Sequence, residues 1–183
     1  MKALILATGA AVVSATVPAS AQVVKVGGSF AEGCYRAAEV RLPAYEALKT
    51  CDRALREQML SRFEQFATYV NRGILRMARG DYRAAKIDLD RALAMAPDRP
   101  EPWLNLGILR FKQGDSAGAI PLFDRAMALG TNVPEIAYYG RGLAHEDLGN
   151  VKAAYADLRR AVALKPQWDE PARELARYQV VQR

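Results

Sequence analysis

Three stretches of the sequence can be laid over one another. They read NRGILRMARGDYRAAKIDLDRALAMAP (71–97), NLGILRFKQGDSAGAIPLFDRAMALGT (105–131) and GRGLAHEDLGNVKAAYADLRRAVALKP (140–166). The second begins 34 residues after the first, and the third begins 35 residues after the second because one residue is added near Pro134. Small residues, turn residues and large apolar residues recur in phase, so the chain is predicted to contain three copies of one structural unit.

Each unit has the pattern of a helical hairpin. Its first helix begins near an aromatic residue and carries a glycine at a fixed place, which is Gly73, Gly107 or Gly142. A glycine inside a helix costs about 1 kcal/mol relative to alanine. Because this unfavourable choice is repeated, we expect a neighbouring helix to approach closely at each of these positions.

The turn between the two helices is repeated as well. The matching pairs are Gly80-Asp81, Gly114-Asp115 and Gly149-Asn150. Glycine accepts the left-handed conformation that ends a helix, and Asp or Asn can accept a bond from the free N–H groups of the next helix. Arg79-Gly80-Asp81 has the letters of an adhesion tripeptide, but Gln113 and Leu148 replace its arginine in the other units. The tripeptide is therefore interpreted as a turn.

The second helix of each unit carries one apolar stripe. Its members are Ala85, Leu89 and Ala92 in the first unit, Ala119, Phe123 and Ala126 in the second, and Ala154, Leu158 and Ala161 in the third. The steps of four and three residues place each set on one helix face. A single hairpin cannot bury both of its faces, so the units are expected to stack.

These positions resemble the 34-residue pattern of the tetratricopeptide-repeat family over residues 66–168. The resemblance implies an all-α fold, a right-handed superhelix of antiparallel helix pairs, with a concave groove lined by the first helices. Arg72 and Arg141 depart from the pattern where the family usually has leucine, and Thr131 stands in place of a proline. The combination of an N-terminal signal peptide, a leading hairpin that contains two cysteines, and three repeats is similar to small exported bacterial members of the family.

The chain is accordingly divided into seven segments. We expect a cleaved signal peptide (1–21), an N-terminal tail (22–30), a degenerate helical hairpin (31–65), three repeats (66–99, 100–134 and 135–168) and a C-terminal capping helix (169–183). Cys34 and Cys51 are the only cysteines and lie 17 residues apart. In an oxidising compartment this pair is predicted to form a disulfide across the first hairpin, with two buried thiols or a zinc site that lacks its other ligands as the alternatives.

The N-terminus has the pattern of a secretory signal. Lys2 precedes an almost uncharged apolar run, and Ala19-Ser20-Ala21 provides the small-x-small cleavage pattern. The run is shorter than the roughly 20 residues that span a bilayer as a helix. We therefore expect a periplasmic or secreted protein that begins at Gln22, without an integral membrane segment; a retained membrane anchor is the alternative.

The composition and the charge pattern argue against catalysis and against nucleic-acid binding. The formal charge is +6, and its arginines are interleaved with acidic residues rather than grouped in a basic patch. His145 is the single histidine and has no partner at metal or catalytic spacing. Asp88 and Arg91 are expected to form an ordinary surface pair. We predict no enzyme, no cofactor, no metal site and no nucleic-acid partner.

Function is therefore expected on the groove. Its predicted inward residues are Val70, Asn71, Ile74, Met77, Leu104, Asn105, Ile108, Phe111, Tyr139, Leu143 and Glu146. Some family members capture a terminal carboxylate here with Lys, Arg and Asn, but this chain matches that set only at Asn105. Asn71 and Asn105 are spaced to bond the backbone of an extended peptide, as asparagines at this slot do in some relatives, and the ladder ends at Gly140.

An apolar strip dominates the predicted groove. It consists of Ile74, Ile108, Phe111, Tyr139 and Leu143. Exposed apolar patches of this kind usually mark interaction sites. We favour a non-catalytic scaffold or adaptor of the bacterial cell envelope that docks a segment of an unidentified protein or peptide in the groove. The alternatives are self-association into a homo-oligomer, covering of the strip by the chain's own 23–30 segment or by tight curvature, and binding of an anionic envelope polymer through scattered arginines.

Overall fold

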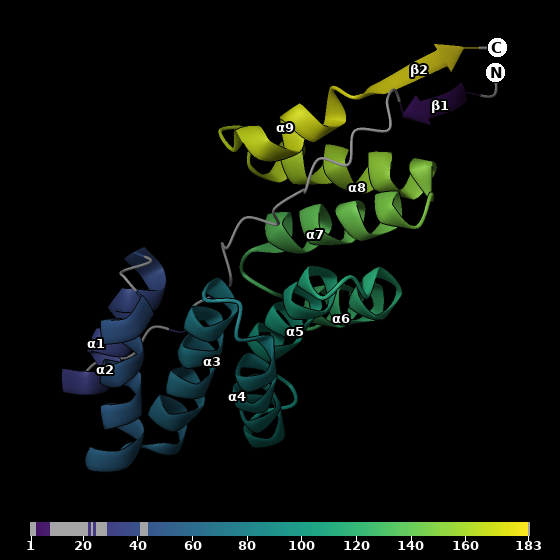
Figure 1. Ribbon diagram of the computed structural model, residues 1–183. Helices are drawn as coiled ribbons and strands as arrows, with labels where there is room; N and C mark the ends of the chain where they lie inside the picture. The colour runs from purple at the N-terminus through teal and green to yellow at the C-terminus, as the bar shows by residue number, and fades with distance from the viewer. Residues whose placement is uncertain (1–2, 8–21, 23, 25–28, 41–43, 183) are drawn as a thin grey trace.

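The computed structural model describes residues 3–7, 22, 24, 29–40 and 44–182 (Figure 1). The elements in chain order are β1 (Ala3–Ala7), α1 (Ser29–Val40), α2 (Ala44–Glu57), α3 (Arg62–Ala78), α4 (Tyr82–Met95), α5 (Pro100–Lys112), α6 (Ser116–Ala128), α7 (Pro134–Asp147), α8 (Val151–Leu164), α9 (Asp169–Leu175) and β2 (Tyr178–Gln182). Of the helices in these ranges, none is both long enough and apolar enough to cross a lipid bilayer.

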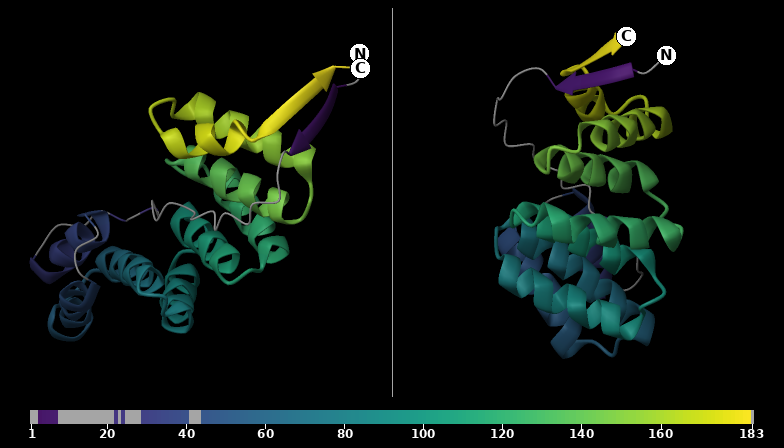
Figure 2. Two further views of the ribbon diagram at one scale, coloured as in Figure 1. Left: turned by 45° about the horizontal axis from the view of Figure 1, so that its top comes forward. Right: turned by 90° about the vertical axis from the view of Figure 1, so that its right-hand side faces the viewer.

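The helices form antiparallel pairs that stack in chain order. α1 packs on α2, α3 on α4, α5 on α6 and α7 on α8, and the second helix of each pair also contacts the first helix of the next. α1, α3, α5 and α7 touch in succession and form one layer of the curved array, as Figures 1 and 2 show. The predicted all-α stack of helix pairs is confirmed.

The predicted glycine contacts explain how tightly the two helices of a unit pack. A Cβ added to Gly73 would lie 3.0 Å from Leu89 Cγ, and one added to Gly107 would lie 2.9 Å from the ring of Phe123. The alanine and leucine or phenylalanine stripes of α4, α6 and α8 are fully buried. Each large side chain therefore fills the space that the facing glycine leaves.

The turns have the predicted chemistry, with one exception. Gly80 has φ 78°, and the side chain of Asp81 accepts a hydrogen bond from the N–H of Ala84 at 3.1 Å. Asp115 caps α6 in the same way, whereas the side chain of Asn150 makes no cap bond to α8. The Arg79-Gly80-Asp81 tripeptide is thus the end of one helix and the cap of the next.

Two helix boundaries differ from the predicted segment boundaries. α3 begins at Arg62, before the predicted start of the first repeat at residue 66, because Ser61 and Glu64 form a reciprocal capping box. The segment 169–183, predicted as one helix, is helical only over Asp169–Leu175. The following residues form β2, which suits the β-propensity of Tyr and Val in YQVVQ.

β2 pairs antiparallel with β1, the part of the predicted signal peptide that the structure describes. Ala3 lies opposite Gln182 and Ala7 opposite Tyr178. The rest of residues 1–21, including the proposed cleavage pattern, lies outside the described residues. Cleavage at residue 21 stays a prediction.

Candidate functional site

The predicted groove residues lie together on α3, α5 and α7, but most of them are buried. Phe111 and Glu146 are partly buried, and the other nine are at most 5 % exposed. Most of the apolar strip is therefore not exposed, which favours the alternative in which the chain itself covers it. Among the described residues, Gln22 and Val24 contact this face from the N-terminal side of the chain, and Trp168 and Arg177 contact it from the C-terminal side.

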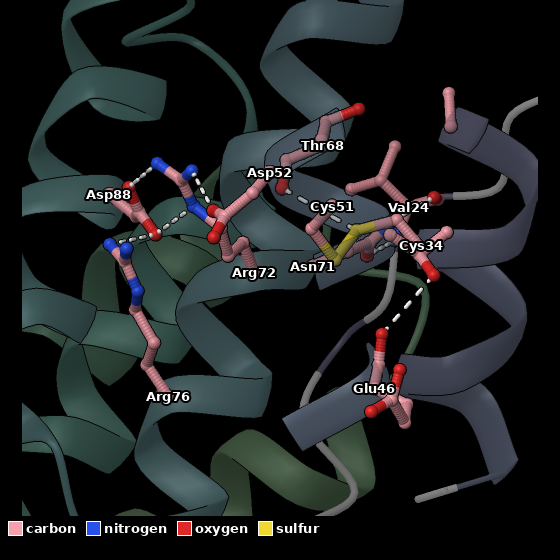
Figure 3. Close-up of a disulfide and its surroundings, with 12 residues drawn as sticks. Val24, Cys34, Glu46, Cys51, Asp52, Thr68, Asn71, Arg72, Arg76 and Asp88 are labelled. Atoms are coloured by element: carbon pink, nitrogen blue, oxygen red, sulfur yellow. Dashed lines mark hydrogen bonds and ion pairs between the residues drawn. A yellow bond between two sulfur atoms is a disulfide. The ribbon is translucent and has the colours of Figure 1, made fainter. Parts of the chain in front are cut away.

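Asn71 binds both main-chain polar groups of Val24. Its Oδ1 accepts from the Val24 N–H at 2.8 Å, and its Nδ2 donates to the Val24 carbonyl at 2.8 Å. Asn71 and Val24 are both buried, and Figure 3 shows the two residues next to the α1 hairpin. Since both bonds go to backbone atoms, the bonds themselves can be made to any residue that has a main-chain N–H.

Asn105 makes only one of the two corresponding bonds to the main chain of Gln22. Its Nδ2 donates to the Gln22 carbonyl at 3.2 Å and to the Glu101 carbonyl at 3.0 Å. Its Oδ1 is buried and has no hydrogen-bond partner among the residues that the structure describes. A buried acceptor without a donor is unfavourable by about 1–3 kcal/mol. An extended segment that supplied an N–H here would remove that penalty.

The side chain of Gln22 is held where the repeat pattern is irregular. Thr131 Oγ1 donates to Gln22 Oε1 at 2.8 Å, and Gln22 Nε2 donates to Asn132 Oδ1 at 2.6 Å. Thr131 also accepts from the Val133 N–H at 3.3 Å, which directs its hydroxyl proton toward Gln22. This contact thus lies where the middle unit lacks the proline and carries the added residue.

The C-terminal segment covers the groove side of the third unit. The ring of Trp168 meets Tyr139 edge-on, with centroids 4.9 Å apart, and Arg177 pairs with Glu146. Burial raises the pKa of Tyr139 far above its ordinary value, and burial outweighs the attraction of Arg177 in raising the pKa of Glu146. No asparagine could replace Gly140 here, because a Cβ would lie 2.6 Å from Phe123 Cζ.

A cavity of about 410 Å³ remains beside the Asn71 clamp. Its lining residues are Ile74, Met77, Ala78, Arg79, Gly80, Tyr82, Ile108 and Lys112. Ile74 lies one helical turn after Asn71. The groove thus offers a backbone clamp and an adjoining largely apolar space that a side chain of a bound segment can enter.

A disulfide joins the two helices of the first hairpin, and an ionic network connects this hairpin to the stack (Figure 3). The predicted Cys34–Cys51 bond is present, with Cα atoms 4.8 Å apart. Arg72 donates from Nε and Nη2 to the two carboxylate oxygens of Asp88 at 2.8 and 2.7 Å, and from Nη1 to Asp52 at 2.6 Å. Because these residues lie on α3, α4 and α2, one guanidinium joins three helices.

Asp88 is therefore not the surface residue that the sequence suggested. It is fully buried, and it binds Arg72 and Arg76 instead of Arg91. The spacing of residues along α4 predicted Arg91 as the neighbour of Asp88. It could not show that Arg72 and Arg76 of α3 reach the same carboxylate.

The same arrangement recurs in the third unit. Arg141 donates to both oxygens of Asp157 on α8 at 2.8 and 2.7 Å, and it also pairs with Asp124 on α6. These bonds raise the pKa of Arg141 above its ordinary value, with the Asp157 bonds as the main cause. The two arginines that depart from the family pattern are thus structural links between neighbouring helices.

Solved structures with a similar fold cover most of the chain. A structure titled MamA 41-end from Desulfovibrio magneticus RS-1 has a TM-score of 0.63 and 21 % identity over 82 % of this chain and 84 % of that chain. A structure of PilW, titled a widely conserved type IV pilus biogenesis factor, has a TM-score of 0.70 and 22 % identity over 82 % of this chain and 69 % of that chain. Identities this low show the fold alone.

The sequence itself matches family models for the tetratricopeptide repeat. Residues 70–134 match one model and residues 136–167 match a second, which together span more than half of the chain. A search of curated proteins found no match. A repeat stack of this kind is a scaffold for protein interactions, and the chain belongs to the tetratricopeptide-repeat family.

Proposed function

We propose that the concave face of the stack binds an extended segment of a protein partner and that the protein acts as a non-catalytic adaptor. The observation that carries this proposal is the Asn71 clamp, which holds both main-chain polar groups of Val24. Recognition through backbone bonds is how grooves and sheet edges take up extended peptides, with side-chain pockets adding specificity.

The cavity lined by Ile74, Met77 and Ile108 supports the same proposal. It is largely apolar and adjoins the clamp, so a bound segment can place an apolar side chain there while its backbone is held at Asn71. Burying such a side chain is worth about 1.5–3 kcal/mol. The clamp and the cavity together provide affinity and a preference for apolar residues.

The proposal is tested by selecting a random library of linear decapeptides against the full chain carrying Val24→Pro. Proline has no N–H for Asn71 to accept, so this variant frees the groove. We expect binders that lose at least about tenfold in affinity when Asn71→Ala is added. Asn150→Ala is the matched control, because Asn150 is exposed and its side chain makes no cap bond. A library without any Asn71-dependent binder would refute the proposal.

The same experiment at different salt concentrations addresses the anionic-polymer alternative. Groove binding through backbone bonds and apolar burial is expected to change little between low and physiological salt. Association through scattered arginines would weaken strongly over that range. Solution mass of the unliganded chain addresses self-association, since a monomer at high concentration contradicts it.

We also propose that the protein works in the periplasm or outside the cell. The Cys34–Cys51 disulfide supports this location, because disulfides persist mainly in oxidising compartments. The apolar run after Lys2 and the Ala19-Ser20-Ala21 pattern support it from the sequence. N-terminal sequencing of the protein from its own cells is the test: Gln22 as the first residue is expected, and an intact Met1 would refute cleavage.

A further inference from the structure

The middle repeat departs from the family pattern at one place, and a glutamine side chain is bound there. Gln22 is 6 % exposed, and both polar atoms of its primary amide are paired. Thr131 donates to the oxygen, and Asn132 accepts from the nitrogen. A Thr hydroxyl as donor beside an Asn oxygen as acceptor matches a primary amide, which presents one acceptor and two donors. Methionine has a similar length and would leave both groups unpaired.

This contact and the Asn71 clamp fix one register. The side chain of Gln22 is held at the loop before α7, and the main chain of Val24 is held on α3. The bound segment therefore runs opposite to the order of the repeats. A ligand that uses both contacts needs a glutamine two residues before the clamped position, and that position must be small enough to be buried, as Val24 is.

The contacts of Gln22 and Val24 are incomplete at Asn105. Among the described residues no donor reaches its buried Oδ1. A competing segment that places an N–H at this atom gains a hydrogen bond that the chain's own residues do not make.

We propose that Thr131 and Asn132 form a subsite for a glutamine side chain, and that Gln22 and Val24 occupy the groove as an internal ligand. The partner then presents an extended segment with glutamine two residues before an aliphatic residue, and it binds by displacing the chain's own segment. This inference rests on the proposed function, because it names the segment that the groove takes.

Internal occupation has a measurable consequence for affinity. A segment of the same chain competes at an effective concentration on the order of millimolar. A peptide added in trans must overcome that competition, so its apparent affinity for the native chain is lower than for a chain whose own segment is released. The difference is the signature of the internal ligand.

The first test measures binding of an acetylated and amidated peptide of sequence QVVKVG, which is residues 22–27, to the full chain. Val24→Pro is expected to strengthen binding at least about tenfold over the native chain, whereas Val24→Ile, which keeps the N–H, is not. N-methylation of the third peptide residue removes the N–H that Asn71 accepts and is expected to abolish the gain. Equal affinity for the native and Val24→Pro chains would overturn internal occupation.

The second test uses the Val24→Pro chain to examine the glutamine subsite. Thr131→Val is expected to weaken the QVVKVG peptide about fivefold or more and to leave the methionine analogue MVVKVG unchanged. Thr131→Ser keeps the hydroxyl and is expected to stay within about twofold of Thr131. Equal losses for the two peptides, or none, would overturn the subsite. If linear peptides still bind through Asn71, the proposed function survives that result; if none binds, both fail.

Discussion

The buried carboxylate of Asp88 provides the sharpest test of how this stack is held together. Replacing it by leucine removes three hydrogen bonds and leaves the Arg72 guanidinium, whose side chain is 10 % exposed, with Asp52 as its remaining carboxylate partner. Breaking a buried ion pair on one side is unfavourable by about 3–5 kcal/mol. Asp88→Leu is therefore expected to lower the free energy of unfolding by that amount.

The double variant Arg72→Leu/Asp88→Leu is expected to behave differently. Leu106 and Leu122 stand at the matching positions of the middle unit, where Leu106 is buried in the core and Leu122 packs against it, so this fold accepts an apolar pair at this place. Replacing a buried ion pair by apolar residues of similar size is often neutral or stabilising. Arg76 remains, and its side chain is 21 % exposed, so it can turn toward water.

Urea unfolding of the native chain, both single variants and the double variant measures the coupling, with the disulfide kept intact. The double variant is expected within about 1.5 kcal/mol of the native protein, which gives a coupling of about 3 kcal/mol or more. In thermal unfolding, Asp88→Leu is expected to lower the Tm by about 6–20 °C, at about 2–4 °C per kcal/mol. A double variant as unstable as Asp88→Leu, or a neutral Asp88→Leu, would refute the reasoning.

Three further outcomes are expected. Gly140→Ala pushes a Cβ into Phe123, 2.6 Å from its Cζ, and is expected to destabilise by about 1–3 kcal/mol in urea unfolding, with part recovered by Phe123→Leu; no loss would contradict the packing. Replacing Cys34 and Cys51 by serine is expected to lower the free energy of unfolding in urea by about 3 kcal/mol relative to the native chain with its disulfide intact, and an unchanged stability would contradict this. Burial raises the folded pKa of Glu146, so the folded state binds that proton more tightly and stability falls as pH rises through the raised pKa. Unfolding between about pH 4 and pH 7 should show this fall, and Glu146→Gln should remove it; an identical pH profile would contradict the burial effect.

The features of the helical hairpin were predictable because the same sequence pattern occurs in all three repeats. The glycine opposite Leu89 or Phe123, the Gly-Asp turn and the alanine stripe all follow from local rules that a 34-residue period makes visible. The disulfide followed from cysteine content. The Arg–Asp links were missed although a signal existed: positions 72, 106 and 141 change together with positions 88, 122 and 157, as Arg with Asp or Leu with Leu.

The covering of the groove was not predictable in the same way. Val24 reaches Asn71 over 47 residues, and Gln22 reaches Asn105 over 83 residues. Neither contact repeats, and each joins a segment outside the periodic region to the stack. The sequence alone left three readings open for the apolar strip, and only the placement of these segments identifies what covers it. The strand Tyr178–Gln182 was missed because the charges of the preceding residues suggested a longer amphipathic helix.

The alternation of ionic and apolar links along the stack bears on how the chain avoids misfolding. Repeats with similar sequences can misfold by pairing the first helix of one unit with the second helix of another, because the packing surfaces of the units are alike. Here a first helix carrying Arg72 or Arg141 that docked on the second helix of the middle unit would face Leu122 and lose its bonds to Asp88 or Asp157. The reverse error would place Asp88 or Asp157 opposite Leu106 instead of its arginine. The Arg–Asp links therefore favour the pairing of each first helix with the second helix of its own hairpin.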